Sequence, residues 1–230
     1  MKRFWKDVSV SDGDSGWSIQ LDGRPVKTPA RELLSLPTRA LADAIAAEWA
    51  AVEGDIDPRA MPLTGLANAA IDRIATDWDA FARDLAKYSE ADLTCYRADW
   101  PPELVERQAQ GWDPLLAWAR RRYDVDFVTS TGVTHVPQPP ATVEQLSHAV
   151  AALDPFRLAG LSPLVTIGGS LIAALAVLEN AFSPVDNWDA VSIDDRWQLE
   201  QWGSDPEAEL ALENRKRDFL AAARFLDLLN

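Results

Sequence analysis

Cysteine, histidine and methionine are scarce in this 230-residue chain, which has one Cys, two His and two Met. Because Cys95 has no second cysteine to pair with, an intramolecular disulfide is excluded, as is typical of a reducing compartment. His135 and His148 do not stand in a metal-ligand spacing, so surface or capping roles are expected for both. We therefore predict no metal site, no cofactor and no catalytic residue, and we expect Cys95 to be a small buried residue.

Positive charge is also in short supply. The chain has 22 Lys and Arg against 36 Asp and Glu, which gives a net charge of -14. Such a chain repels phosphate backbones and anionic membrane surfaces, so neither nucleic acid nor membrane is an expected partner. A basic protein surface is its electrostatic complement. Its hydrophobic fraction of 47% is nevertheless typical of a globular protein.

Long uninterrupted apolar runs and nucleotide-binding fingerprints are lacking as well. Residues 158–178 carry no charge, but their glycines and Pro163 should break the segment into two helices, and no Lys or Arg cluster flanks it. A buried pair of helices, and no membrane insertion, is therefore expected. Residues 167–170 lack the Lys of a phosphate loop. Because the N-terminal decapeptide also lacks an apolar signal run, we expect a cytoplasmic bacterial protein or an organellar protein that has already been processed.

The spacing of apolar residues changes near residue 36. Trp17, Ile19 and Leu21 alternate with polar residues, and Asp22-Gly23 is a strong hairpin signal, so a small antiparallel sheet is expected up to that point. Apolar residues then recur at helical spacing. Helices are expected at about 41–52, 63–75, 78–88, 101–123, 142–153, 185–201 and 206–229, besides the pair in 158–178.

These patterns predict an α+β fold. A small N-terminal antiparallel β domain, residues 1–58, is followed by a larger, mainly α-helical C-terminal domain, residues 59–230. Within the latter, Asp113-Pro114 should kink or split its helix, and Thr142 with Gln145 forms a capping-box pattern. Residues 125–136 are rich in β-branched side chains and are expected to be extended.

Acidic and tryptophan residues gather in one predicted helix near the C-terminus. Asp194, Asp195 and Glu200 are accompanied by Trp197 and Trp202. Adjacent residues on a helix diverge, so Asp194 and Asp195 should not converge on one substrate atom. A solvated helix face, a partner-binding surface and an acid/base enzyme that uses a carboxylate pair near Asp194 all remain open from these residues alone.

Segments that follow one another along nearly the whole chain carry a family resemblance. They are Arg3–Lys6, Leu21–Ala30, Leu34–Pro37, Leu41–Trp49, Ile56–Asp72, Asp92–Ala98, Gln110–Trp118 and Gln198–Gly203. This ordered set resembles the assembly chaperone family of the F-type ATP synthase catalytic head that binds the alpha subunit. The resemblance implies the same two-part architecture, and binding to the free alpha subunit, without ATP, until the beta subunit takes its place.

The resemblance also implies site residues. The functional acidic residue of the family lies a few positions before the motif Gln201-Trp202-Gly203, in the stretch that reads Ile193–Arg196 here, and Asp194 is favoured. If Asp194 faces solvent, its charge reversal should leave the melting temperature unchanged. Trp49 matches a position that the family needs; its helical face predicts a mostly buried, structural residue. The sequence does not define an oligomeric state.

Overall fold

The structure is a computed structural model that describes residues 2–13, 16–132, 134–203 and 205–230. Its contacts cluster into two compact units. Unit 1 contains Met1–Trp78, Asp154–Gly160 and Arg224–Asn230, and unit 2 contains Asp79–Leu153 and Leu161–Ala223. The predicted α+β class, with a small N-terminal sheet and a mainly helical remainder, is confirmed. Since each unit collects segments that are distant in sequence, the boundary between residues 58 and 59 stays a prediction.

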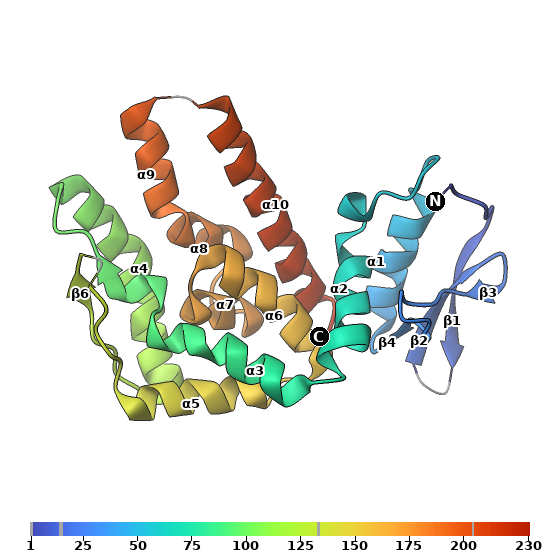
Figure 1. Ribbon diagram of the computed structural model, residues 1–230, viewed down its shortest axis with the longest axis horizontal. Helices are drawn as coiled ribbons and strands as arrows, with labels where there is room; N and C mark the ends of the chain where they lie inside the picture. The colour runs from blue at the N-terminus through green and yellow to red at the C-terminus, as the bar shows by residue number, and fades with distance from the viewer. Residues whose placement is uncertain (1, 14–15, 133, 204) are drawn as a thin grey trace. The chain divides into compact units, whose positions relative to one another are not determined.

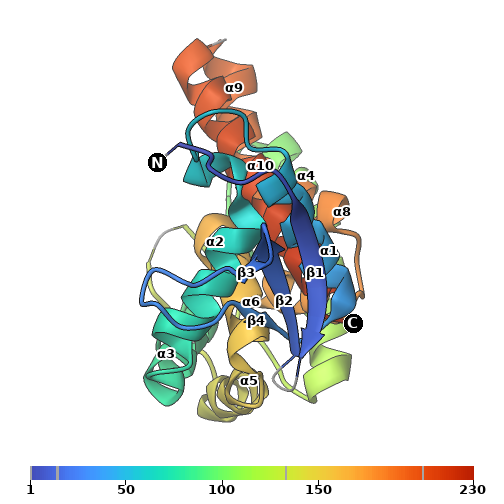
Figure 2. The same ribbon diagram turned by 90° about the vertical axis from the view of Figure 1, so that its right-hand side faces the viewer.

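The sheet of unit 1 forms around β2 (Gly16–Leu21). β1 (Val8–Gly13), β3 (Arg24–Pro25) and β4 (Ser35–Leu36) all pair with β2 in antiparallel register. Asp22 and Gly23 have φ values of 50° and 77°, the left-handed conformation that the Asp-Gly turn signal predicted. Figure 2 shows these strands lying against α1 (Arg39–Ala50). The buried side chains of the sheet and of α1 share the core of this unit.

Two polar contacts fix the helices of unit 1. The Thr38 hydroxyl caps α1, accepting from the Leu41 N–H and donating to the Leu228 carbonyl at 2.5 Å. The Glu48 carboxylate accepts from the backbone N–H groups of Leu63 and Thr64, each at 2.8 Å. These belong to α2 (Pro62–Ala69), whose N-terminus has no side-chain cap of its own, so Glu48 provides one from α1. A 3-10 turn (Pro58–Ala60) precedes α2, and a π-turn (Ala70–Ile74) continues it.

Unit 2 is built mostly from helices around α7 (Leu171–Leu178), whose residues Leu171 to Val177 are all buried. Figure 1 shows α7 among its neighbours. The other helices in this part of the chain, with α6 and α10 continuing into unit 1, are α3 (Trp78–Ala86), α4 (Pro102–Tyr123), α5 (Pro140–Ala151), α6 (Pro155–Gly168), α8 (Pro184–Val191), α9 (Ile193–Trp202) and α10 (Pro206–Asp227). Short 3-10 turns lie at Lys87–Glu90 and Leu93–Cys95. β5 (Tyr96–Arg97) pairs in parallel with β6 (Ser130–Thr131).

A buried carboxylate holds the start of α7. Asp92, with no exposed surface, accepts hydrogen bonds from the N–H and hydroxyl of Thr94, the hydroxyl of Ser170 and the N–H of Ile172, at 2.8–3.0 Å. Burial raises the pKa of Asp92, and these hydrogen bonds oppose that effect. Because Ser170 is also the N-cap of α7, Asp92 ties the turn before β5 to the central helix.

Several predicted elements need correction. Residues 158–178 do form two helices, but Pro163 lies inside α6, and the break comes at Gly169, whose φ is 68°. The single helix predicted over 185–201 is two helices, α8 and α9, which meet at Ser192. Pro114 does not split α4.

The capping box was also predicted wrongly, and the segment predicted to be extended contains one short strand. α5 begins at Pro140, and the Thr142 hydroxyl donates to the Asp126 carbonyl instead of capping the helix. Of the segment predicted to be extended, only Ser130–Thr131 is a strand among the residues described, and position 133 lies outside them. None of the helices in the described chain combines the length and the hydropathy that crossing a bilayer requires.

Candidate partner-binding site

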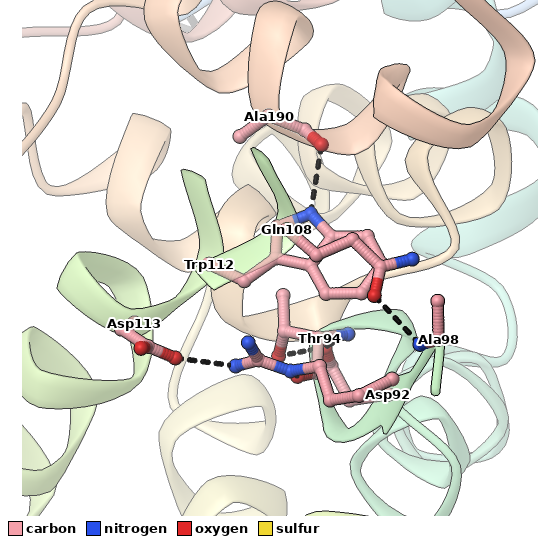
Figure 3. A network of polar contacts seen from close by, with 8 residues as sticks. Asp92, Thr94, Ala98, Gln108, Trp112, Asp113 and Ala190 are labelled. Atoms are coloured by element: carbon pink, nitrogen blue, oxygen red, sulfur yellow. Dashed lines mark hydrogen bonds and ion pairs between the residues drawn. The ribbon is translucent and has the colours of Figure 1, made fainter. Parts of the chain in front are cut away.

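The helix that carries the predicted site, α9, is anchored at its first residue. Ile193 is 8% exposed, and its Cδ1 lies 2.6 Å from the position that a Cβ on Gly111 of α4 would occupy. Glycine at 111 is therefore what permits this approach. At the next residue of α4, the buried Trp112 donates its indole N–H to the Ala190 carbonyl at 2.8 Å (Figure 3). The base of α9 is rigidly placed, and the rest of the helix projects from it.

Asp194 faces α4 and is half-buried. Its Oδ1 accepts a hydrogen bond of 2.7 Å from the side-chain amide of Gln108. Gln108 is only 3% exposed, and its carbonyl oxygen accepts from the Ala98 N–H at 2.8 Å (Figure 3). Asp194 is thus the acceptor for a buried amide, and the solvent-facing position considered from the sequence is wrong.

Trp197 and Glu200 share one basic partner on α4. The Arg107 guanidinium lies over the Trp197 ring, 4.9 Å from its centroid, and its Nη1 is 2.7 Å from Glu200 Oε2. The pair between Arg107 and Glu200 is exposed, so its contribution to stability is small. Its effect is to fix the tryptophan ring and the carboxylate in place on the α4 side of α9.

Asp195 faces the opposite way, toward α10. Its Oδ2 is 2.8 Å from Nη1 of Arg215, whose Nη2 donates to the Ile167 carbonyl at 3.0 Å. Asp194 and Asp195 therefore diverge to different helices, as their adjacency on a helix predicted. Asp194 and Asp195 therefore do not converge on one point in the structure.

Between α9 and α10 lies an open groove of about 510 Å³, which we call the α9–α10 groove. Its lining combines the apolar side chains of Leu199, Trp202, Ala208, Ala211 and Leu212 with the polar side chains of Asp195, Gln198, Asp205 and Arg215. Trp202 is 89% exposed and Leu210, on the adjoining helix, is 62% exposed. A highly exposed tryptophan in a groove that combines apolar and charged side chains is typical of a protein-binding site.

The other groups considered from the sequence do not line this groove. Cys95 is buried, and desolvation raises the pKa of its thiol to about 12, which leaves it unreactive near neutral pH. His135 Nδ1 lies 3.1 Å from the Tyr96 hydroxyl. His148 is exposed in the last turn of α5. Within the described ranges, no cluster of His, Cys, Asp and Glu side chains could hold a metal ion.

Trp49 lies in α1, which belongs to unit 1, whereas the site residues of α9 belong to unit 2. Its ring packs edge-on against the buried Trp5 at a centroid distance of 5.2 Å. It is half-buried, less than the mostly buried position that was predicted. Its neighbour Glu48 caps α2, so the Glu48-Trp49 pair joins α1 to both the N-terminal segment and α2.

Sequence reasoning missed the basic and amide partners of α9. Arg107, Gln108 and Arg215 hold its acidic side chains, but nothing in the local sequence pairs them with it. One signal did exist: Gln108 stands four residues before Trp112, on the apolar face of α4. A polar residue on a buried face needs a partner, but the sequence does not indicate that Asp194 is that partner.

Comparison with known proteins agrees with the fold and with the ordered sequence segments. The family described as ATP12 chaperone protein matches residues 2–120. The crystal structure of Atp12 from Paracoccus denitrificans is 44% identical, with a TM-score of 0.94, over 100% of this chain and 98% of that one. A protein of known structure from Agrobacterium tumefaciens is 39% identical, also with a TM-score of 0.94, over 100% of this chain and 86% of that one.

A more distant relative is also similar along most of its length. The mitochondrial protein atp12 of Schizosaccharomyces pombe is 23% identical over 235 residues, which cover 96% of this chain and 81% of the relative. The extent of the family match and the identity to the bacterial structure together settle the assignment: the chain belongs to the ATP12 chaperone family of ATP synthase assembly chaperones.

Proposed function

We propose that this protein is an ATP-independent assembly chaperone that binds the free alpha subunit of the F-type ATP synthase catalytic head. It prevents aggregation of that subunit until the beta subunit replaces it. The observation that carries the proposal is the 89% exposed Trp202 at the mouth of the α9–α10 groove. A large exposed aromatic beside a groove is a typical anchor for a protein partner.

A free subunit exposes the apolar surface that its neighbour will cover, and such surfaces aggregate. A chaperone needs only to cover that surface reversibly. Trp202 and Leu199 offer the apolar contact, and the net charge of -14 favours a partner with basic groups around its apolar patch. Asp194, Asp195, Trp197, Glu200 and Trp202 are proposed as the partner-binding set, with Trp202 as its most accessible member.

The roles of these residues differ in the proposal. Asp194 and Asp195 hold α9 between α4 and α10 through Gln108 and Arg215. Trp202 makes the direct contact. We further propose that the protein acts without catalysis, because a holdase of this kind needs no nucleophile, metal or nucleotide. Its proposed location is the bacterial cytoplasm.

The test is co-expression with an isolated bacterial alpha subunit. We expect the subunit to remain in the soluble fraction with the wild-type chain, and to be lost from it with Trp202→Ala. Because Trp202 is exposed, this change should shift the free energy of unfolding by no more than about 0.5 kcal/mol. Trp100→Ala is the matched control, since Trp100 is 73% exposed and does not line the groove. Equal protection by both variants would contradict the assignment of the surface.

A further inference from the structure

A second, more apolar groove lies wholly within unit 1. It runs between the turn that follows β3 and the helices α1 and α2, and its volume is about 580 Å³. We call it the hairpin–helix groove. Its principal lining residues are Phe4, Val26, Trp49, Pro58, Met61 and Gly65.

The floor of this groove is solid and its rim is open. Val26 and Met61 are 7% and 4% exposed, so they belong to the core and form a fixed apolar floor. Phe4 on the rim is 66% exposed, and its ring packs edge-on against Trp5, which in turn contacts Trp49. This row of aromatic rings gives one wall of the groove a large apolar surface that the fold itself does not cover.

Gly65 lines the groove at a point where no other atom of the described residues fills the space beside α2. It is an exposed residue inside α2 with ordinary helical backbone, so no left-handed conformation requires glycine there. A Cβ at this position would meet nothing within 4 Å. Glycine weakens a helix interior, and here neither the backbone nor packing in unit 1 explains it. The absence of a side chain instead leaves room for a group from outside to approach the helix.

The charge on the groove differs from that of the chain as a whole. Arg24 and Lys27 line it and are both exposed, and neither forms an ion pair with another side chain of the described residues. In a chain with a net charge of -14, these two basic side chains stand beside one apolar surface and make the rim locally basic, while the nearby Asp22 carboxylate accepts from the Asp7 and Lys6 N–H groups, which lower its pKa, as Arg24 also does. Such a rim selects an occupant that carries negative charge next to an apolar group.

We propose that the hairpin–helix groove binds an extended polypeptide segment in which a bulky apolar side chain stands next to a carboxylate. The apolar side chain fills the space over Gly65, between Phe4 and Trp49. The carboxylate meets Arg24 and Lys27 at the rim. The inference rests on the proposed function in one respect, because the alpha subunit is the polypeptide expected to supply this segment. The alpha subunit would then contact both this groove and the α9–α10 groove.

The direct test uses the full chain and a fluorescein-labelled peptide, Gly-Glu-Leu-Phe-Glu-Gly, with fluorescence anisotropy as the measurement. Gly65→Leu should fill the groove without disturbing the helix and weaken binding on the order of tenfold or more, as the loss of a packed anchor does. Ala47→Leu adds the same side chain at an exposed position of α1 outside the groove and should bind as the wild type does. Lys27→Glu should also weaken binding, and Lys27→Arg should retain it.

Several results would overturn the inference. One is equal binding of the peptide by Gly65→Leu and the wild type, and another is equal binding of a Gly-Lys-Leu-Phe-Lys-Gly peptide. A wild-type dimer in sedimentation that Gly65→Leu dissociates would identify a second copy of the chain as the occupant instead. If the acidic peptide binds in this groove but the wild-type chain fails to keep the alpha subunit soluble, the proposed function fails while the assignment of the groove stands. Should Gly65→Leu not fold, Lys27→Glu carries the test.

Discussion

Replacing Asp194 separates a structural role from a partner-binding role. In Asp194→Ala, the Gln108 amide loses its acceptor while it remains only 3% exposed. A buried donor left without a partner costs about 1–3 kcal/mol. For a chain of this size, that loss lowers the melting temperature by about 2–4 °C per kcal/mol. We therefore expect Asp194→Ala to melt measurably below the wild type.

The side chains around Asp194 provide internal controls. Asp194→Asn keeps an acceptor oxygen for Gln108, so it should recover most of the lost stability while it removes the charge. In a double-mutant cycle with Gln108→Leu, the two changes should couple by about 0.5–3 kcal/mol, because they remove the same hydrogen bond. Gln108→Leu alone carries a further cost, since it also leaves the Ala98 N–H without its acceptor.

The assay combines thermal melting with protection of a co-expressed alpha subunit. If Asp194→Ala melts like the wild type, the reasoning from the buried amide is refuted. If Asp194→Asn melts normally but no longer protects the subunit, the charge of Asp194 contacts the partner directly. If it melts normally and still protects, Asp194 acts only by holding α9 in place.

Three further predictions concern the rest of the chain. Leu171→Asp places an unpaired carboxylate in the fully buried α7, so it should destabilise the fold by about 3–5 kcal/mol, measured from urea unfolding. Trp49→Arg removes a ring packed on Trp5 and should cost about 2–3 kcal/mol; a variant that melts normally yet fails to bind would contradict its structural role. Cys95, with its thiol pKa raised to about 12, should resist iodoacetamide at about pH 8 and react only when urea unfolds the protein, and rapid labelling of the native chain would show that the residue is accessible.

The hairpin and the long helices could be predicted because their signals are local. Asp22-Gly23 specifies its turn through the backbone that those two residues accept, and helical periodicity depends only on spacing within the helix. The divergence of Asp194 and Asp195 followed from helix geometry in the same way.

What could not be predicted depends on contacts between distant residues. No proline or glycine separates α8 from α9, and the corner at Ser192 is set by its hydroxyl, which donates to the Trp188 carbonyl, and by Ile193 packing against Gly111. Gln108 and Arg215 are brought to the acidic residues only by tertiary structure. The hairpin–helix groove was missed for the same reason, because an open space beside Gly65 has no signature in the order of residues.

Unit 1 is completed by Arg224–Asn230, and this affects how the chain folds during translation. The Thr38 hydroxyl bonds to the Leu228 carbonyl, 190 positions later, and Phe225 stacks on Phe156. When the sheet and α1 leave the ribosome, residues 224–230, which complete unit 1, have not yet been synthesised. The sheet and α1 therefore finish folding only after residues 224–230 have been synthesised, and until then the apolar surface that these residues cover is open to aggregation, like that of a subunit that lacks its neighbour.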